Sequence, residues 1–298
     1  MISIKQLGYA LAVQKTLHFK KAAELCHISQ SALSTALSEL EKQLGVQIFE
    51  RDNKKVLVTS IGEEVLERAK NIMLQVKDLE HLADSQKVPL SFPITIGMIP
   101  TIAPYLLPKV FPTLKQKYPL AQISVVEEHS HVLVDMVRSG EIDTAILALP
   151  FPCEGLLTME FWQEDFFWVT LKDNKRAQQK EVTSIEVNQS KLMLLKEGHC
   201  LKDHILDVCK LSGQNAYHDF GAASLNTLIQ MIQCNLGTTL IPAMAKEQLI
   251  DANEKLSAVH LGEPGPHRRI AFILRPNYTR LSSIEAFAEI CKKELDKG

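Results

Sequence analysis

Six cysteines, at positions 26, 153, 200, 209, 234 and 291, could carry redox or metal chemistry in this chain of 298 residues. None of them forms the Cys-x-x-Cys spacing of a structural zinc site, so we expect no metal and no cofactor. Cys200 and Cys209 are close enough in sequence to act together. Chance could also place two of six cysteines this close, so their spacing leaves open a redox pair or two buried thiols.

The residues around Cys200 favour a reactive thiol. Gly198 and the turn before it place Cys200 at the start of a helix, where unpaired N–H groups and the helix dipole stabilise an anion. His199 and Lys202 add possible positive charge or hydrogen-bond donors. We therefore expect a stabilised thiolate, the form that attacks a peroxide oxygen. The product is a sulfenic acid, which a second thiol can trap as a disulfide.

A helix predicted over residues 201–211 would keep Cys200 and Cys209 apart. Residues nine apart lie roughly 13 Å apart along a helix axis, whereas a disulfide needs Cα atoms within about 7 Å. The bond could form only if this segment unwound. Oxidation would then change the shape of the protein, as a redox switch requires.

The region from His18 to Arg51 has the pattern of a helix-turn-helix, with a polar turn in which Ser29 or Gln30 begins the second helix. Apolar residues at helical spacing mark the two helices at Ala22, Ala23 and Leu25, then at Leu33, Leu37, Leu40 and Leu44. The outward face of the second helix carries small polar side chains that can approach bases and phosphates. These are Gln30, Ser31, Ser34, Thr35 and Ser38.

Three further elements surround this region. A first helix is predicted over residues 4–14, and Gly45 is followed by a β-hairpin over residues 46–59, the wing of a winged helix. Arg51, Lys54 and Lys55 lie where a wing meets phosphates, although a solvated turn would have the same composition. The next helix, over residues 63–84, carries a continuous apolar stripe about 30 Å long. That stripe must pack against a second subunit or against the chain's own body.

Alternating strands and helices follow a polar, proline-containing hinge at residues 85–93. Strands are predicted at 94–97, 122–127, 144–149, 164–171, 191–195, 238–241 and 271–274, and helices at 103–117, 132–139, 201–211, 224–233, from 243 onward and at 281–295. Repeated β-α-β units indicate two small α/β subdomains. Crossings between them are expected near residues 150–163 and 262–268.

Composition is that of an ordinary globular protein, with 46% hydrophobic and 23% charged residues. The net charge of −2 divides unevenly, because residues 1–60 carry eight Lys and Arg against five Asp and Glu, or +3, and the remainder carries −5. A basic N-terminal part suits DNA binding. No apolar run near the start is long enough for a signal peptide or membrane span. We therefore expect a cytoplasmic protein with reduced cysteines and no membrane partner.

The motif F-x-x-A-A-x5-S-Q-S-A-L-S-x-x-L-x-x-L-E-x-x-L-G-V-x-I-F-E-R, from Phe19 to Arg51, resembles the DNA-binding domain of LysR-type transcriptional regulators. That family usually has Pro where this chain has Ser31. The resemblance implies an all-α winged helix-turn-helix at residues 1–60 and a linker or dimerisation helix with hinge at 61–92. It also implies a periplasmic-binding-protein-like α/β effector domain at 93–298. Subdomain I would cover about 93–160 and 269–298, and subdomain II about 161–268.

Within that family the chain is similar to the peroxide-sensing activators. The similarity lies in G-H-C-L-K-D around Cys200, I-G-M-I-P-T-I-A-P-Y-L-L-P from Ile96 to Pro108, A-S-L-N-T-L near Ser224 and R-P-N at Arg275. It implies that Cys200 is the peroxidatic cysteine and Cys209 the resolving one. It also implies a peroxide pocket containing Thr101, Ser130, His199 and Arg268. Ser130 stands in place of a Thr, and Lys202 in place of an Arg.

The resemblance also implies partners. These are double-stranded promoter DNA, further copies of the chain in a dimer through the linker helix and in a tetramer, RNA polymerase, hydrogen peroxide as the signal and a glutaredoxin- or thioredoxin-type reductant. Oxidation would change promoter binding and the activation of antioxidant genes, without enzymatic turnover. Two alternatives remain open: a small metabolite in the effector cleft as the signal, or a thiol peroxidase that uses the same cysteine.

Overall fold

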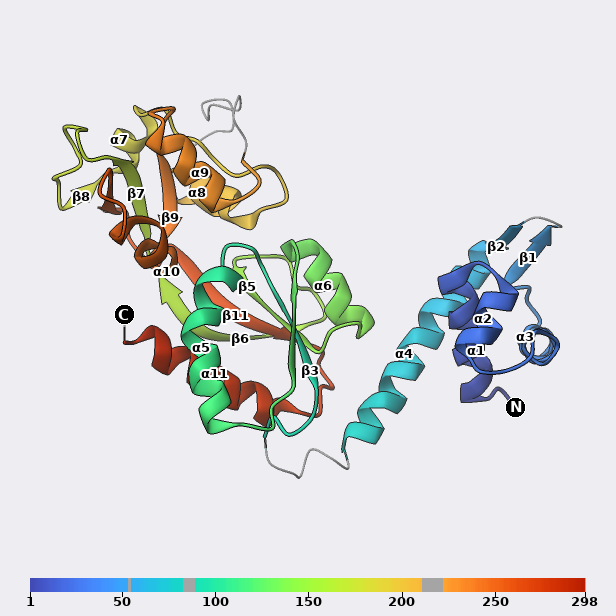
Figure 1. Ribbon diagram of the computed structural model, residues 1–298. Helices are drawn as coiled ribbons and strands as arrows, with labels where there is room; N and C mark the ends of the chain where they lie inside the picture. The colour runs from blue at the N-terminus through green and yellow to red at the C-terminus, as the bar shows by residue number, and fades with distance from the viewer. Residues whose placement is uncertain (53–54, 83–88, 211–221, 298) are drawn as a thin grey trace. The chain divides into compact units, whose positions relative to one another are not determined.

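The chain forms two compact units, Met1–Gln86 and Lys87–Gly298. The computed structural model describes residues 1–52, 55–82, 89–210 and 222–297 (Figure 1). None of the helices in these ranges combines the length and apolar character that crossing a membrane requires.

The N-terminal unit is a winged helix-turn-helix followed by a long helix, as predicted. Its elements are α1 Ile4–Thr16, α2 Phe19–Leu25, α3 Gln30–Leu44, β1 Phe49–Asp52, β2 Lys55–Val58 and α4 Ser60–Leu82. The Ala32 N–H donates to Ser29 Oγ at 3.2 Å, so Ser29 caps α3, and Gly45 at φ +70° ends it. Strands β1 and β2 pair antiparallel from Phe49–Val58 to Asp52–Lys55.

Two details of this unit differ from the expectations. Leu25 is 58% exposed and does not belong to the buried side of α2, which Ala22 and Ala23 form. Helix α4 begins at Ser60 because Thr59 precedes it as a cap, its hydroxyl accepting from the Gly62 N–H at 2.9 Å.

The apolar stripe of α4 is divided between two environments. Leu66 and Ala69 are buried in the core of their own unit, together with leucines of α3. Ile72 and Leu79 are 43% and 67% exposed. The chain therefore covers only part of the stripe itself.

The first sheet of the C-terminal unit has the strand order β4-β3-β5-β11-β6. Its strands are β3 Ile94–Met98, β4 Ile123–Glu127, β5 Thr144–Leu149, β6 Leu157–Glu164 and β11 Arg268–Leu274. Strand β3 runs parallel to β4 and β5, and β11 runs antiparallel to β5 and β6. Helices α5 (Ala103–Lys117) and α11 (Leu281–Leu295) lie side by side, while α6 (Ser130–Ser139) packs against β5 and β11 (Figure 1).

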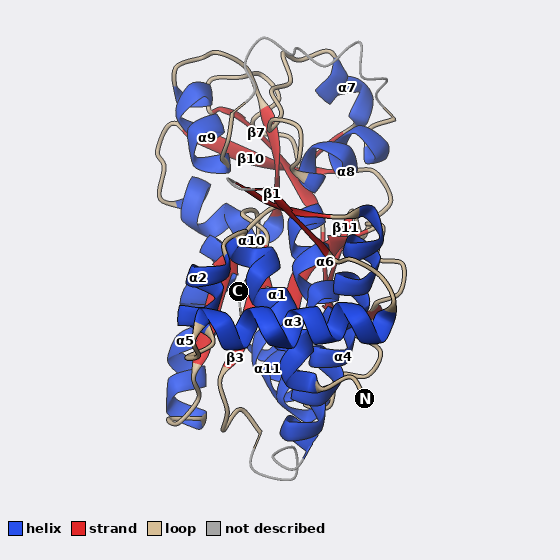
Figure 2. Ribbon diagram, turned by 90° about the vertical axis from the view of Figure 1, so that its right-hand side faces the viewer, coloured by secondary structure: helices blue, strands red, loops and turns tan. Residues whose placement is uncertain are grey.

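The second sheet has the order β8-β10-β7-β9 and forms the other lobe of this unit (Figure 2). Its strands are β7 Phe166–Leu171, β8 Glu181–Val182, β9 Thr239–Pro242 and β10 Leu256–Leu261. The helices of this lobe are α7 Ser184–Asn188, α8 Cys200–Val208, α9 Leu225–Gln233, α10 Ala243–Lys246 and the π-helical turn η2 Glu247–Asp251.

The chain passes between the two sheets twice. The second crossing, at residues 262–267 between β10 and β11, confirms the expected position. The first lies at Asp165, between β6 and β7, and not over residues 150–163, because residues 157–163 belong to β6, which pairs with β11. The predicted strand at residues 191–195 is wrong as well, since this segment makes only the isolated bridges Leu192–Thr238 and Leu195–Ala222.

Candidate redox site and DNA-binding face

Two helix N-termini, one from each lobe, meet at a small cavity. Cys200 is the first residue of α8, and Ser130 is the first residue of α6. The cavity has a volume of about 10 Å³, which is roughly what a single water molecule requires. Its lining residues are Ile99, Pro100, Thr101, His129, Ser130, Gly198, His199 and Cys200. The site can therefore hold one very small polar molecule beside the thiol.

Burial raises the pKa of the Cys200 thiol above its ordinary value, and two neighbours act in the opposite direction. The buried Ser130 hydroxyl, whose oxygen has no hydrogen-bond partner among the described residues, and the positively charged Arg268 guanidinium both lower the pKa of this thiol. Asp203 on α8 adds to the increase. The expectation of a stabilised thiolate is wrong for this structure, because desolvation outweighs the favourable groups.

The two positive groups expected beside the thiol do not supply charge to it. Burial, and then the neighbouring His129, lower the pKa of His199, so its imidazole is neutral near pH 7. Lys202 pairs with the carboxylate of Glu197, with Nζ–Oε1 at 3.6 Å. The cation that acts on the thiol comes instead from Arg268, more than sixty residues further along the chain.

Arg268 is fully buried and stands behind the cavity wall. Its Nη1 donates to Thr101 Oγ1 at 3.0 Å, which fixes a wall residue of the cavity. Its Nε and Nη2 donate to Glu164 Oε1 at 2.8 and 2.6 Å. This two-point pairing holds the guanidinium plane in one orientation.

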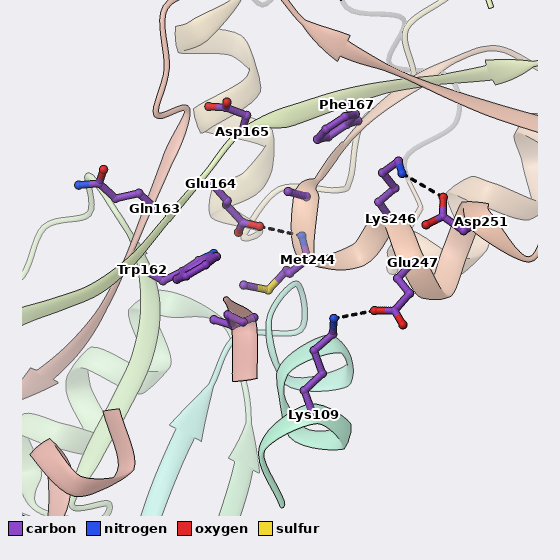
Figure 3. A pocket seen from close by; sticks show the side chains of 12 residues that line it. Lys109, Trp162, Gln163, Glu164, Asp165, Phe167, Met244, Lys246, Glu247 and Asp251 are labelled. Atoms are coloured by element: carbon purple, nitrogen blue, oxygen red, sulfur yellow. Dashed lines mark hydrogen bonds and ion pairs between the residues drawn. The ribbon is translucent and has the colours of Figure 1, made fainter. Parts of the chain in front are cut away.

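Glu164, the last residue of β6, is a site residue that sequence reasoning missed. Its second oxygen, Oε2, accepts from the Met244 N–H at 2.9 Å at the start of α10 (Figure 3). One carboxylate therefore connects Arg268 in the first sheet to a helix of the second lobe. The local sequence gives little sign of this role, because the arginine it binds lies 104 residues away.

A larger cavity of about 370 Å³ lies on the α10 side of Glu164. Trp162, Phe167 and Met244 supply apolar surface (Figure 3), and Lys109 pairs with Glu247 at 2.6 Å across it. Its volume is within the range of small-molecule sites.

Cys209 lies at the opposite end of α8, where it is the C-terminal cap residue and is 5% exposed. Burial and the nearby Glu263 carboxylate raise the pKa of its thiol to about 12. Cys200 and Cys209 are both free thiols in this structure, separated by the intact helix. Cys209 does not line the cavity.

Four of the five α3 residues singled out for DNA binding have exposed side chains, namely Gln30, Ser31, Thr35 and Ser38, while Ser34 is half-buried. Ser31, at the position of the family's usual Pro, hydrogen-bonds with the cap residue Ser29 at 3.1 Å. Arg51 and Lys55 belong to the wing strands. Lys54 lies outside the described residues.

The chain is similar to known proteins over both of its units. The family described as "Bacterial regulatory helix-turn-helix protein, lysR family" matches residues 4–63, and "LysR substrate binding domain" matches residues 90–296. The "DNA-binding transcriptional dual regulator OxyR" of Escherichia coli strain K12 is 34% identical over 297 residues, covering 99% of this chain and 96% of the relative.

Solved structures of OxyR proteins are also similar to this chain. A full-length OxyR of Pseudomonas aeruginosa with Asp in place of a Cys superposes with a TM-score of 0.79 at 31% identity, over 98% of this chain and 95% of that one. An H2O2-bound OxyR of Corynebacterium glutamicum with Ser in place of a Cys has a TM-score of 0.69 at 31% identity, over 100% and 94%.

Proposed function

Because the chain belongs to the LysR family of bacterial regulatory helix-turn-helix proteins, we propose that it is a peroxide-sensing, DNA-binding transcriptional regulator. It is similar over nearly its whole length to OxyR proteins, one of which was solved with H2O2 bound. The observation that carries the proposal is Cys200, a thiol beside a cavity for one small polar molecule and at the start of a helix whose end holds Cys209.

The first step is oxidation of Cys200 by hydrogen peroxide. The Cys200 sulfur attacks one peroxide oxygen, the S–O bond forms and the O–O bond breaks. The departing hydroxide takes up the thiol proton as water. Ser130 and the Thr101 hydroxyl held by Arg268 supply polar contacts for the peroxide.

The second step is disulfide formation. The Cys209 sulfur attacks the sulfenic sulfur of Cys200 and releases water, so that one peroxide and two thiols give one disulfide and two waters. Helix α8 must unwind for the sulfurs to meet, because its ends are roughly 13 Å apart along the axis. A glutaredoxin- or thioredoxin-type dithiol returns both cysteines to thiols.

The output is a change in promoter binding by a homo-oligomer. Helix α3 enters the major groove with Gln30, Ser31, Ser34, Thr35 and Ser38, and the wing residues Arg51, Lys54 and Lys55 contact phosphates. Dimers form through α4 and associate further into tetramers. Contact with RNA polymerase leads to activation of antioxidant genes in the cytoplasm.

Thiol mapping tests the proposal. The full chain receives a brief, near-stoichiometric pulse of hydrogen peroxide, and alkylation with mass spectrometry then locates the oxidised cysteines. We expect a Cys200–Cys209 disulfide, and loss of the peroxide-dependent change in promoter footprint in Cys200→Ser. Two free thiols after the pulse would refute the mechanism. Rapid consumption of many peroxide equivalents with a reductant would instead indicate a peroxidase.

A metabolite-responsive regulator is the second candidate, favoured by the 370 Å³ cavity beside Glu164. It predicts that Cys200→Ser responds to its signal like the wild type. The same promoter assay therefore separates the two candidates.

A further inference from the structure

The walls of the small cavity differ in exposure. Five lining residues are buried, at 7% exposure or less: Ile99, Thr101, Ser130, His199 and Cys200. Gly198 is exposed, and Pro100 and His129 are half-buried. The mouth of the cavity therefore lies among these last three residues.

Only one of the mouth residues has a side chain that can move aside. Gly198 has no side chain, and the ring of Pro100 is closed onto its own backbone. His129 carries a ring on two rotatable bonds, so its position decides how wide the mouth is.

The contacts of the His129 ring place it at the mouth. A Cβ atom placed on Gly198 would lie 3.2 Å from His129 Cδ2, so the ring lies directly against this glycine. The ring centroid is 4.5 Å from that of His199, edge to face, and 6.0 Å from that of His131. His129 is the N-cap residue of α6, yet its side chain does not cap the helix. The ring lies against Gly198 and His199 at the cavity instead.

We propose that the imidazole of His129 is a gate that selects among hydroperoxides, admitting hydrogen peroxide to Cys200 and excluding those with a bulky organic substituent. This inference rests on the proposed peroxide-sensing function. Both substrates react alike, since the sulfur takes one oxygen, the O–O bond breaks and the second oxygen leaves. That oxygen departs as hydroxide from hydrogen peroxide and as alkoxide from an organic hydroperoxide, and it takes the thiol proton. Only the organic hydroperoxide carries carbon atoms, and the cavity has space for about one water-sized molecule.

The test compares His129→Ala with His131→Ala in the full chain. His131 is the next histidine of α6, and it is exposed and outside the cavity lining, so it is a matched control. The readout is the second-order rate constant for Cys200 oxidation by hydrogen peroxide and by cumene hydroperoxide, followed by quenching and alkylation. We expect the cumene hydroperoxide rate constant to rise about tenfold in His129→Ala, the scale at which pocket contacts discriminate substrates. His131→Ala should keep the wild-type ratio of the two constants.

His129→Asn is a second variant in case the alanine variant folds poorly. Asn is favoured at helix N-caps and is intermediate in size between His and Ala. The cumene hydroperoxide rate constant of His129→Asn should therefore lie between those of the wild type and His129→Ala. Unchanged cumene hydroperoxide rate constants in both variants, or an equal rise in His131→Ala, would overturn the gate while leaving the proposed function intact. A wild-type Cys200 that does not react with hydrogen peroxide would overturn both.

Discussion

The reactivity of Cys200 depends on a balance between burial and two polar neighbours. Burial excludes water and keeps the thiol protonated, whereas the Ser130 hydroxyl and the Arg268 charge favour the thiolate. A protonated, enclosed thiol reacts slowly with oxidants that do not enter the cavity. A peroxide that enters must therefore accept the thiol proton in the course of the reaction.

This balance predicts how alkylation of Cys200 depends on pH. The pKa of Cys200 is raised, so its thiolate population, and with it the rate of iodoacetamide alkylation, should still be rising above pH 9.0, the ordinary pKa value. Ser130→Ala should move the midpoint of this profile higher still, because a hydroxyl that lowers the pKa of the thiol is lost. Ser139→Ala, at the exposed end of the same helix, is the control. A wild-type midpoint below the ordinary value would show that the thiolate is stabilised as the sequence predicts.

Glu164 and Glu160 offer a matched pair for measuring the buried ion pair. Glu164 is 5% exposed and pairs with the fully buried Arg268, while Glu160 on the same strand pairs with the neighbouring Arg269 at the surface. We expect Glu164→Gln to lower the free energy of unfolding by about 3 kcal/mol, because it leaves a buried guanidinium without its counter-charge. Glu160→Gln should cost less than about 1 kcal/mol.

Urea unfolding followed by tryptophan fluorescence measures the free energy of unfolding of the C-terminal unit, which contains both ion pairs. The chain has two tryptophans, Trp162 and Trp168, and both belong to the C-terminal unit. Equal and small losses in the two variants would mean that the Glu164–Arg268 pair is no more stabilising than a surface pair.

Among the secondary-structure elements, α8 is the one that the proposed switch must break. It is nine residues long, carries the two thiols at its ends and precedes residues 211–221, which lie outside the described ranges. A helix this short owes its stability to packing more than to its own hydrogen bonds. Changes in helix propensity should therefore alter the rate of disulfide formation.

Asp207 is an exposed residue of α8 at which this idea can be tested. Asp207→Ala and Asp207→Gly remove the same charge but differ in helix propensity by about 1 kcal/mol. We expect the disulfide to form about fivefold faster from the sulfenic acid in the glycine variant. Rapid-quench alkylation with mass spectrometry resolves sulfenic acid from disulfide. Equal rates would mean that the bond forms without unwinding of α8.

The elements that the sequence predicted well are those with a strong local pattern. Helices α5 and α11 and strand β5 have their predicted bounds, because each has helical periodicity or a short buried run between clear breaks. Strand β6 was missed because it is the edge strand of its sheet, and only Phe161 and Glu164 in it are buried. A buried glutamate hides the alternation that marks a strand.

The candidate site, too, was predicted from the sequence only in part. Resemblance to a family located the thiol and the wall residues Thr101 and Ser130, which do line one cavity. It could not show that burial outweighs the helix dipole at Cys200, because desolvation depends on the whole fold. Nor could it find Glu164, whose partners come from distant parts of the chain.

For the whole molecule, the uncovered part of α4 is the feature that points to assembly. Ile61, Ile72 and Leu79 are exposed and lie eleven and seven residues apart, which at 3.6 residues per turn returns them to nearly the same face. Leu66 and Ala69 lie on another side and are buried within their own unit. A regulator that reads two half-sites needs two recognition helices, so a second copy is the occupant that we expect on this face.

Leu79→Glu should weaken that association. Each apolar side chain of this size contributes about 1.5–3 kcal/mol when fully buried, so a charged replacement should raise the dimer dissociation constant on the order of 100-fold. Asn71→Glu introduces the same side chain at an exposed position on a different side of α4 and should leave the constant near its wild-type value. Sedimentation equilibrium of the two variants measures the effect. If Leu79→Glu associates as tightly as the control, the exposed face of α4 is not the contact between subunits.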